Sequence, residues 1–413
     1  MKDHRDHPIS GATGVSRDAF ELALSSFLSW RSDWESHLEG ALCQSPQFTM
    51  AHVLRAYSGL LSRDPRRVRV ARAAHEQAAG LPANSRERLH LAALAAALGD
   101  NFDMCSVLLD EILQQYPRDI LALHAGHAVD YLTGDQKRMA ARVASVLPAW
   151  SAEVPGYHSL LAMHAFSSVE CASYARAEQL GRQALQLNPW DVRAHHAVAH
   201  VFEMTDAAAA GARWMHERSS FWAADSLAAT HCWWHAALFQ LTLGALDGAL
   251  ELYDQRVRAG RSGELADLID ASALLWRIEL QGGATGTRWL ELASAWTPYS
   301  RDGYCSFSDL HAMLAFVGAQ DWRSATRLEA ELLRRRELTS RYGETTRLIG
   351  LPACRGILAY GREDYLRTIE LLSAIPAFAR RMGGSHAQQD VLYLTLVEAA
   401  RRARRPPRGI AAA

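Results

Sequence analysis

Long apolar runs, paired cysteines and an apolar N-terminal stretch are all missing from this sequence of 413 residues. No window approaches the roughly 20 consecutive apolar residues of a membrane-spanning helix, and the opening stretch MKDHRDHPISGATG lacks the apolar segment of a signal peptide. The six cysteines stand singly, with no C-x-x-C pair, which is typical of buried thiols in a reducing compartment. We therefore predict a cytoplasmic protein with no membrane partner.

An excess of charge and the common nucleotide-binding motifs are missing as well. Lys and Arg (44) balance Asp and Glu (45), so no global field attracts nucleic acid. The sequence has no G-x-G-x-x-G after a strand, no P-loop, no H-E-x-x-H and no G-x-S-x-G. These absences argue against a dinucleotide-binding domain, an NTPase and a conventional zinc protease. We expect no nucleotide cofactor and no nucleic-acid partner.

Helical periodicity runs from about Ser16 to about Arg402, and proline occurs only 13 times. The segments EILQQYPRDILAL and QALQLNPWDVRAH resemble one another and place Pro117 and Pro189 72 residues apart, which is two steps of 36. A tetratricopeptide unit is a pair of antiparallel helices of about 34 residues, and proline suits its start because the missing N–H would be unpaired there anyway. Glycines near multiples of this spacing mark turns after apolar segments: Gly99, Gly134, Gly244, Gly318 and Gly361.

These features predict an all-α fold, a tetratricopeptide-like solenoid of helical-hairpin repeats that forms an α-α superhelix. The alternative is an irregular helical bundle in which the spacings arise by chance. We expect residues 1–15 to be a disordered N-terminal arm, residues 16–402 to form the repeat domain, and residues 403–413 to be a disordered basic tail.

Histidines follow the same spacing as the repeats. His196 and His200 are four residues apart and Glu203 lies three further on, so the three side chains share one helix face. His231 and His235 repeat the four-residue spacing 35 residues later. Because 35 residues correspond to one repeat, we expect the two pairs to lie side by side on the first helices of neighbouring units.

Asp270 stands another 35 residues beyond His235, so the repeat predicts a ladder of His200, His235 and Asp270 on the concave face. Packed helices lie about 8–10 Å apart, which lets long side chains from two of them reach one ion. Imidazole and carboxylate ligands suit Zn, Fe, Mn or Cu rather than Ca or Mg. The alternative is that the histidines pack against Trp233 and Trp234 and bind no metal.

Each candidate residue has a predicted role under the metal hypothesis. The metal ligands are His196, His200, His231 and His235. Glu203 and Asp270 are candidates for a carboxylate ligand or a catalytic general base. Further polar residues are candidates for lining a groove or binding substrate: Asp309, His311, Ser385, Gln388 and Asp390. Ser385, in the stretch GGSHAQQDV, is also a candidate helix N-cap.

Seven ordered stretches carry a family resemblance across nearly the whole chain: RERLHLAAL, EILQQYPRDILALHAGH, LNPWDVRAHHAVAHVFEM, HCWWHAALF, DLIDASALLWR, GLPAC and GGSHAQQDV. In these stretches the chain resembles the tetratricopeptide repeat protein 38 family, which overlaps the StaR-like proteins. The resemblance implies an all-helical repeat fold, and its pattern includes the candidate residues above. His195 and His386 are not part of that pattern. Some bacterial relatives are encoded with antibiotic biosynthesis genes, and a hydroxylating, flavin-linked role has been suggested for them.

Two functional hypotheses follow. The first is a metal-dependent enzyme, an oxygenase or hydroxylase type of oxidoreductase or else a hydrolase, acting on a small molecule or a carrier-bound amino acid. The histidines favour metal-based oxidation, whereas no residue pattern supports a flavin. The second is a non-catalytic scaffold that binds a peptide or protein partner in its concave groove, which is the usual role of such repeats.

Overall fold

Helices form the regular structure of the computed structural model, which describes residues 1–301, 305–375 and 377–404. Within those ranges the only β contacts are two isolated bridges, Lys2 with Pro8 and Arg31 with Ser226. This confirms the all-α prediction. The chain divides into two units, Met1–Gly244 and Ala245–Ala413, where a single repeat domain was expected.

The first unit contains helices α1 to α14. Their bounds are α1 Gly14–Leu28, α2 Trp34–Gln44, α3 Thr49–Leu61, α4 Pro65–Ala79, α5 Ser85–Leu98, α6 Phe102–Gln115, α7 Ile120–Thr133, α8 Gln136–Val146, α9 Tyr157–Glu170, α10 Tyr174–Leu187, α11 Val192–Met204, α12 Ala208–Glu217, α13 Ser219–Trp222 and α14 Ala229–Thr242, with a short 3-10 turn at Leu147–Ala149.

The second unit contains helices α15 to α23. Their bounds are α15 Leu246–Leu252, α16 Leu265–Leu280, α17 Arg288–Trp296, α18 Ser306–Gly318, α19 Trp322–Arg335, α20 Arg341–Thr345, α21 Leu351–Gly361, α22 Tyr365–Leu372 and α23 His386–Ala403. Two π-helical stretches, Tyr253–Val257 and Thr346–Gly350, and two 3-10 turns, Thr297–Tyr299 and Ala379–Met382, complete it. No helix in the described parts of the chain is both long and apolar enough to cross a bilayer.

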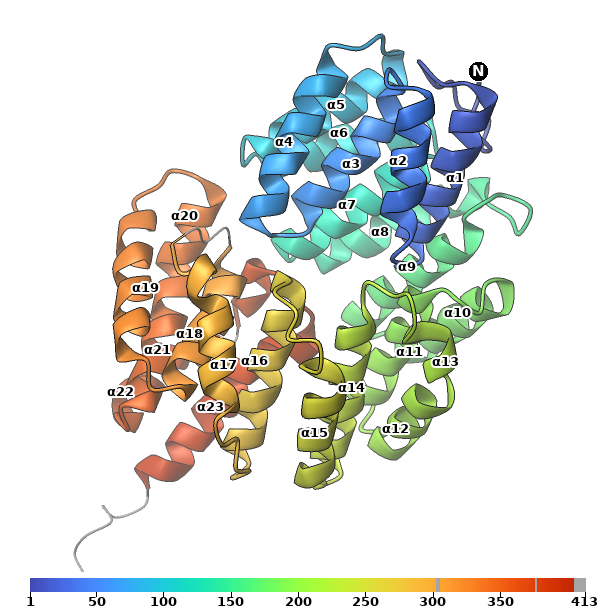
Figure 1. Cartoon of the computed structure of the whole chain (residues 1–413). Coiled ribbons are helices and arrows are strands. Elements are labelled where there is room, and N and C mark those ends of the chain that lie inside the picture. The colour runs from blue at the N-terminus through green and yellow to red at the C-terminus, as the bar shows by residue number, and fades with distance from the viewer. Residues whose placement is uncertain (302–304, 376, 405–413) are drawn as a thin grey trace, which may run out of the picture. The chain divides into compact units, whose positions relative to one another are not determined.

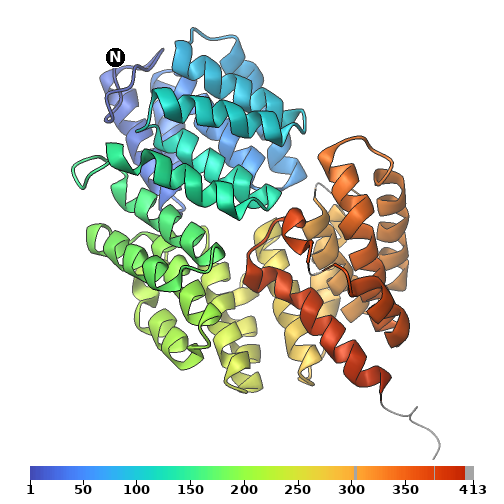
Figure 2. The ribbon, with the colours of Figure 1, turned by 180° about the vertical axis from the view of Figure 1, so that it is seen from behind.

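Consecutive helices pack as hairpins, and the first helices of successive hairpins pack on one another. In the first unit α9 pairs with α10 and α11 with α12, while α11 also contacts α9 and α14. Figure 2 shows the same succession of hairpins in this unit from behind. In the second unit α18 pairs with α19 and α21 with α22, and α18 contacts both α16 and α21. This is the packing of a helical repeat array.

Side-chain contacts recur at a sequence separation of 33 residues, which gives the repeat a physical basis. The contacts are Tyr57 Oη with His90 Nδ1 (3.2 Å), Arg86 Nη1 with Asp119 Oδ2 (2.7 Å), Trp150 Nε1 with the Pro117 carbonyl (2.8 Å), His158 Nδ1 with Asp191 Oδ2 (2.7 Å), Arg258 Nη2 with Glu291 Oε1 (2.6 Å) and Tyr342 Oη with Asp309 Oδ2 (2.7 Å). The same positions of neighbouring hairpins therefore touch repeatedly.

The segments around Pro117 and Pro189 resemble one another because each begins a helix in the same way. Two residues after each proline, Asp119 or Asp191 is the N-cap, and its carboxylate accepts the backbone N–H of Ala122 or Ala194. Such a cap satisfies one of the N–H groups that the first helical turn leaves unpaired. The proline signal thus places the starts of α7 and α11 correctly.

The first fifteen residues differ from the disordered arm that we expected. Lys2 pairs with Pro8, and α1 begins at Gly14. Arg5 is buried and its Nη2 donates to both carboxylate oxygens of Glu21, at 2.9 and 2.8 Å. The polar composition of residues 1–15 wrongly suggests disorder, because charged side chains such as Arg5 have partners in the folded chain. In the predicted basic tail, 403–413, residues 405–413 lie outside the described residues.

Candidate metal centre

Two neighbouring helices of the first unit supply the histidines. α11 carries His196 and His200 one turn apart, α14 carries His231 and His235 with the same spacing, and the two helices are in contact. A four-residue step places both side chains of a pair on one face of a helix. The sequence prediction that the pairs become neighbours after one repeat is correct for these four residues.

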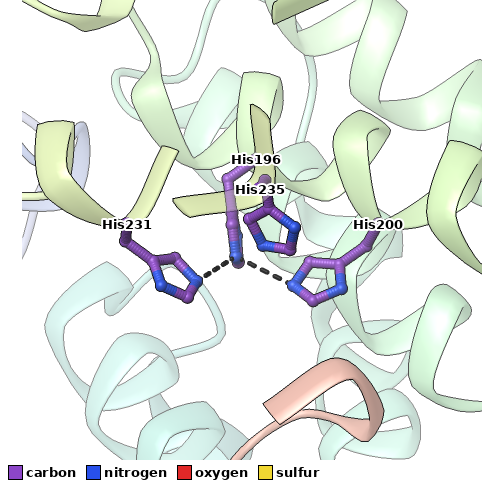
Figure 3. Close-up of side chains that lie close together, drawn as sticks. All are labelled: His196, His200, His231 and His235. Carbon is purple, nitrogen blue, oxygen red and sulfur yellow. Dashed lines mark hydrogen bonds between the residues drawn. The ribbon is translucent and has the colours of Figure 1, made fainter. Parts of the chain in front are cut away.

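The four imidazoles point toward a common centre (Figure 3). One ring nitrogen from each of His196, His200, His231 and His235 belongs to a set whose members all lie within 4.8 Å of one another. The shortest approaches join His196 Nε2 to His200 Nε2, at 2.9 Å, and to His231 Nε2, at 3.0 Å. Metal–nitrogen bonds of about 2.0–2.1 Å place nitrogens of one coordination shell about 3–4 Å apart, so small side-chain shifts suffice to enclose an ion.

Hydrogen bonding alone does not account for the two short contacts of His196. A ring nitrogen of neutral imidazole carries either one proton or one lone pair, so Nε2 of His196 can satisfy only one of two neighbouring Nε2 atoms at a time. A cation accepts a lone pair from all three nitrogens together. The arrangement therefore fits a metal ion better than a hydrogen-bonded histidine cluster.

The aromatic surroundings keep the cluster apolar. The His196 ring lies 5.4 Å from the Trp30 ring and 5.5 Å from Phe166, on which it stacks. His231 stacks on Trp234 with ring centroids 5.2 Å apart. Burial, followed by the neighbouring cluster histidines, holds the pKa of His196 well below its usual value. A neutral imidazole is the form that binds metals.

Glu203 contacts the outer nitrogens of two cluster histidines. Its Oε2 lies 3.1 Å from His235 Nδ1 and 3.9 Å from His200 Nδ1. These are ion-pair distances, and a negative charge beside Nδ1 favours the tautomer that carries its proton there and leaves Nε2 as the metal-binding atom. The geometry thus favours Glu203 as a positioning residue, although the sequence predicted a ligand or general base.

Asp270, His195 and the two tryptophans complete the set of residues considered with the histidines. Asp270 is buried on α16 of the second unit, so the first unit does not assemble the predicted His200, His235 and Asp270 ladder by itself. His195, next to the cluster in sequence, turns away and places Nε2 2.9 Å from the Pro189 carbonyl. Trp233 packs against Trp222, whereas Trp234 meets the histidines as the packing alternative expected.

The candidate groove residues are in the second unit, and most are buried. Asp309 Oδ2 accepts the Tyr342 hydroxyl, and burial raises the pKa of Asp309 to about 6. His311 Nδ1 lies 2.8 Å from the Phe307 carbonyl, which is a structural contact within α18.

The stretch GGSHAQQDV forms the predicted start of the last helix. Ser385 is the N-cap of α23, and it forms a capping box with Gln388. The side chains of both residues are buried, whereas Asp390 is exposed. Reciprocal capping accounts for Ser385 and Gln388 without a ligand.

Sequence reasoning missed three residues at the cluster. Arg193 precedes His196 by three residues, so helical spacing alone places it nearby. Phe166 lies 34 residues, one repeat, before His200 and contacts its ring, so the repeat spacing could have placed it at the cluster. Trp30 follows α1, no motif or spacing links it to the histidines, and only the folded chain shows its contact with His196.

No protein-family model matches the sequence. Among solved structures, the chain is similar to the human IFIT1 dimer with m7Gppp-AAAA at 15% identity over 94% of each chain, with a TM-score of 0.40. It is also similar to the human IFIT1 dimer with PPP-AAAA at 14% identity over 98% of each chain, with a TM-score of 0.42. The P58(IPK) TPR domain matches at 14% identity over 95% of this chain and 99% of that one, with a TM-score of 0.23.

The chain's own structure shows the repeat fold. Its helical hairpins, their stacking and the side-chain contacts at a separation of 33 residues are those of a helical repeat protein.

Proposed function

We propose that this protein is a helical repeat protein with a transition-metal centre, held by His196, His200, His231 and His235. The observation that carries the proposal is the convergence of three Nε2 atoms, with His196 Nε2 at 2.9 Å from one neighbour and 3.0 Å from the other. All-nitrogen ligand sets suit Zn, Cu, Fe or Ni, and an ion held there supplies Lewis-acid or redox chemistry according to its identity.

Two versions of this function differ in what the ion does. Four imidazoles saturate a tetrahedral ion, and saturated sites are typically structural. In the scaffold version the ion joins α11 to α14 and braces a surface that binds a peptide or protein. The repeat architecture favours this version, because arrays of this kind ordinarily act by binding.

In the enzyme version the four histidines would hold a redox-active ion, which would supply the chemistry for oxidation of a small molecule or a carrier-bound amino acid by O₂. Its support is the resemblance to the tetratricopeptide repeat protein 38 and StaR-like group, together with a ligand set that suits Fe or Cu. The two versions separate in one comparison. In the scaffold version, metal removal lowers thermal stability, and partner binding is the sole function. In the enzyme version, metal removal abolishes the consumption of O₂ in the presence of substrate.

Elemental analysis of protein purified without a histidine tag tests the centre. We expect about one transition metal per chain, and less than about 0.1 in the double variant His200→Ala, His235→Ala. The matched control is His195→Ala, because His195 is buried on the same helix but bonds the Pro189 carbonyl instead of the cluster. Wild-type protein that stays metal-free after reconstitution with Zn²⁺, Fe²⁺ and Cu²⁺ would overturn the proposal.

A further inference from the structure

Arg193 lies one helical turn before His196, and among the described residues its guanidinium has no carboxylate partner. Its Nη2 lies 3.4 Å from His124 Nε2, which is its one hydrogen-bond contact among the described residues. Its Nε is closed to solvent and has no hydrogen-bond partner there. Asp191, the carboxylate whose charge acts on Arg193, is already engaged by His158 at 2.7 Å and by the backbone of Ala194. A half-buried cation left in this state is destabilising unless something else pairs with it.

Trp30 covers this guanidinium and connects it to the histidines. The Arg193 Cζ lies 4.6 Å from the centre of the Trp30 ring, and the same ring contacts His196 at 5.4 Å. An arginine stacked on an indole keeps its planar edge available for a two-pronged hydrogen bond. The stacked guanidinium and a cluster histidine thus flank one aromatic surface.

Trp30 is the left-handed residue that ends helix α1. Its φ is +59°, in the left-handed region that bulky residues rarely adopt. Two backbone hydrogen bonds maintain it, from Trp30 N to the Phe27 carbonyl (3.2 Å) and from Leu227 N to the Trp30 carbonyl (2.9 Å). The end of α1 thus fixes the position of Trp30 over the Arg193 guanidinium.

The other neighbours of Arg193 do not neutralise its charge. Burial, and then the Arg193 charge itself, holds the pKa of His124 well below its usual value, so His124 is a neutral acceptor. Burial also lowers the pKa of Arg193, to about 10, which still leaves it charged at neutral pH. The group of Arg193, Trp30 and His124 therefore carries the positive charge of Arg193 beside the four histidines.

We propose that Arg193, under Trp30 and beside His124, is the anchor for a ligand carboxylate that binds next to the four-histidine cluster. A carboxylate matches the guanidinium edge with two parallel hydrogen bonds and supplies the missing negative charge. The position next to the cluster rests on the proposed metal centre, whereas the pairing with Arg193 does not. The carboxylate belongs either to a small organic acid or to the C-terminus of a peptide.

Calorimetric titration of zinc-reconstituted protein tests the anchor. The probes are benzoate and trialanine, with benzamide and trialanine amide as uncharged counterparts and inorganic phosphate as a competing anion. We expect at least one acid to bind saturably, the amides not to bind, and Arg193→Gln to weaken acid binding by roughly tenfold or more. The acid that binds more tightly identifies the source of the carboxylate.

Arg182→Gln is the matched control, because Arg182 also stacks on an indole, 4.8 Å from the Trp214 ring, but already pairs with Glu178. It should bind the acid like wild type. If circular dichroism shows that Arg193→Gln does not fold, Arg193→Lys is used instead. Lysine keeps the positive charge but cannot form two parallel hydrogen bonds to a carboxylate, so acid binding should still be weakened. The anchor is overturned if neither acid binds, or if the Arg193 variants bind the acid as tightly as wild type does. It is also overturned if the amides bind, or if phosphate binds more tightly than the acids.

Zinc content, measured on each sample, separates the anchor from the metal centre. If the protein holds its full zinc content but its acid binding does not depend on Arg193, the anchor is overturned and the metal centre stands. If the protein takes up no zinc but still binds the acid in a way that depends on Arg193, the anchor is supported and the metal centre is overturned.

Discussion

His196 and His231 are 35 residues apart in the sequence, and their Nε2 atoms lie 3.0 Å apart in the fold. One repeat of the chain brings α14 against α11, and the equivalent positions of the two helices face each other. A repeat that duplicates a histidine pair therefore also builds a four-nitrogen cluster. The site is a consequence of the repeat, which is why it is visible in the sequence.

Glu203→Gln should weaken metal binding without unfolding the protein. The Glu203 carboxylate places its negative charge 3.1 Å from His235 Nδ1 and 3.9 Å from His200 Nδ1. Loss of a group that supports metal ligands in this way typically lowers metal affinity about 10–100-fold. Competition with a chromophoric chelator measures the affinity. Glu178→Gln, at an exposed pair with Arg182, is the control and should leave it unchanged. An unaltered affinity in Glu203→Gln would remove the positioning role.

Asp309→Asn should stabilise the protein increasingly as the pH rises. The pKa of Asp309 is about 6 when folded, above the 3.8 of an unperturbed carboxyl, so its ionisation between those values costs folded-state stability in the wild type. The asparagine variant lacks that cost and can still accept the Tyr342 hydroxyl. The stability difference, variant minus wild type, should grow by about 1 kcal/mol or more between pH 5 and pH 8 in urea denaturation.

Asp254→Asn is the control with the opposite sign. The hydrogen bonds from Arg288 lower the pKa of Asp254, so the wild-type carboxylate gains stability as the pH rises from acid. Its exposed position makes the effect small. If the stability difference between Asp309→Asn and wild type does not change with pH, then Asp309 does not have the raised pKa of a buried carboxyl.

Two glycine substitutions in helices should have opposite effects. A Cβ on Gly181 of α10 would lie 2.6 Å from Val198 Cγ2 on α11, so Gly181→Ala should destabilise the first unit by about 1–3 kcal/mol. A Cβ on Gly40 of α2 meets nothing within 4 Å, so Gly40→Ala should stabilise it by about 0.5–1 kcal/mol. Thermal unfolding of both variants measures this, and the same sign for both would contradict the packing of α10 on α11.

The sequence predicts those features of the fold that repeat. Pro117 and Pro189 mark equivalent helix starts because the capping aspartates two residues later are part of the repeated unit. The histidine pairs are predictable for the same reason. Glu203 is placed correctly on its helix, but its role depends on distances to Nδ1 atoms that spacing does not give.

Features that depend on single, long-range contacts are not predictable in this way. Trp30 reaches His196 across 166 positions of the sequence, and nothing in the repeat encodes that contact. Arg5 looks like part of a polar arm until it meets Glu21. Asp270 keeps the 35-residue step but belongs to the second unit, so its predicted place in the ladder stays a prediction.

X-ray absorption spectroscopy at the metal edge of reconstituted protein tests the central claim most directly. The account predicts a first shell of about four nitrogens at roughly 2.0–2.1 Å, with the outer-shell scattering of imidazole rings. The double variant His200→Ala, His235→Ala should lose the imidazole scattering, whereas the control His195→Ala should keep it. A shell of oxygens without imidazole scattering, or a sulfur shell, would show that the metal binds elsewhere and would contradict the four-histidine centre.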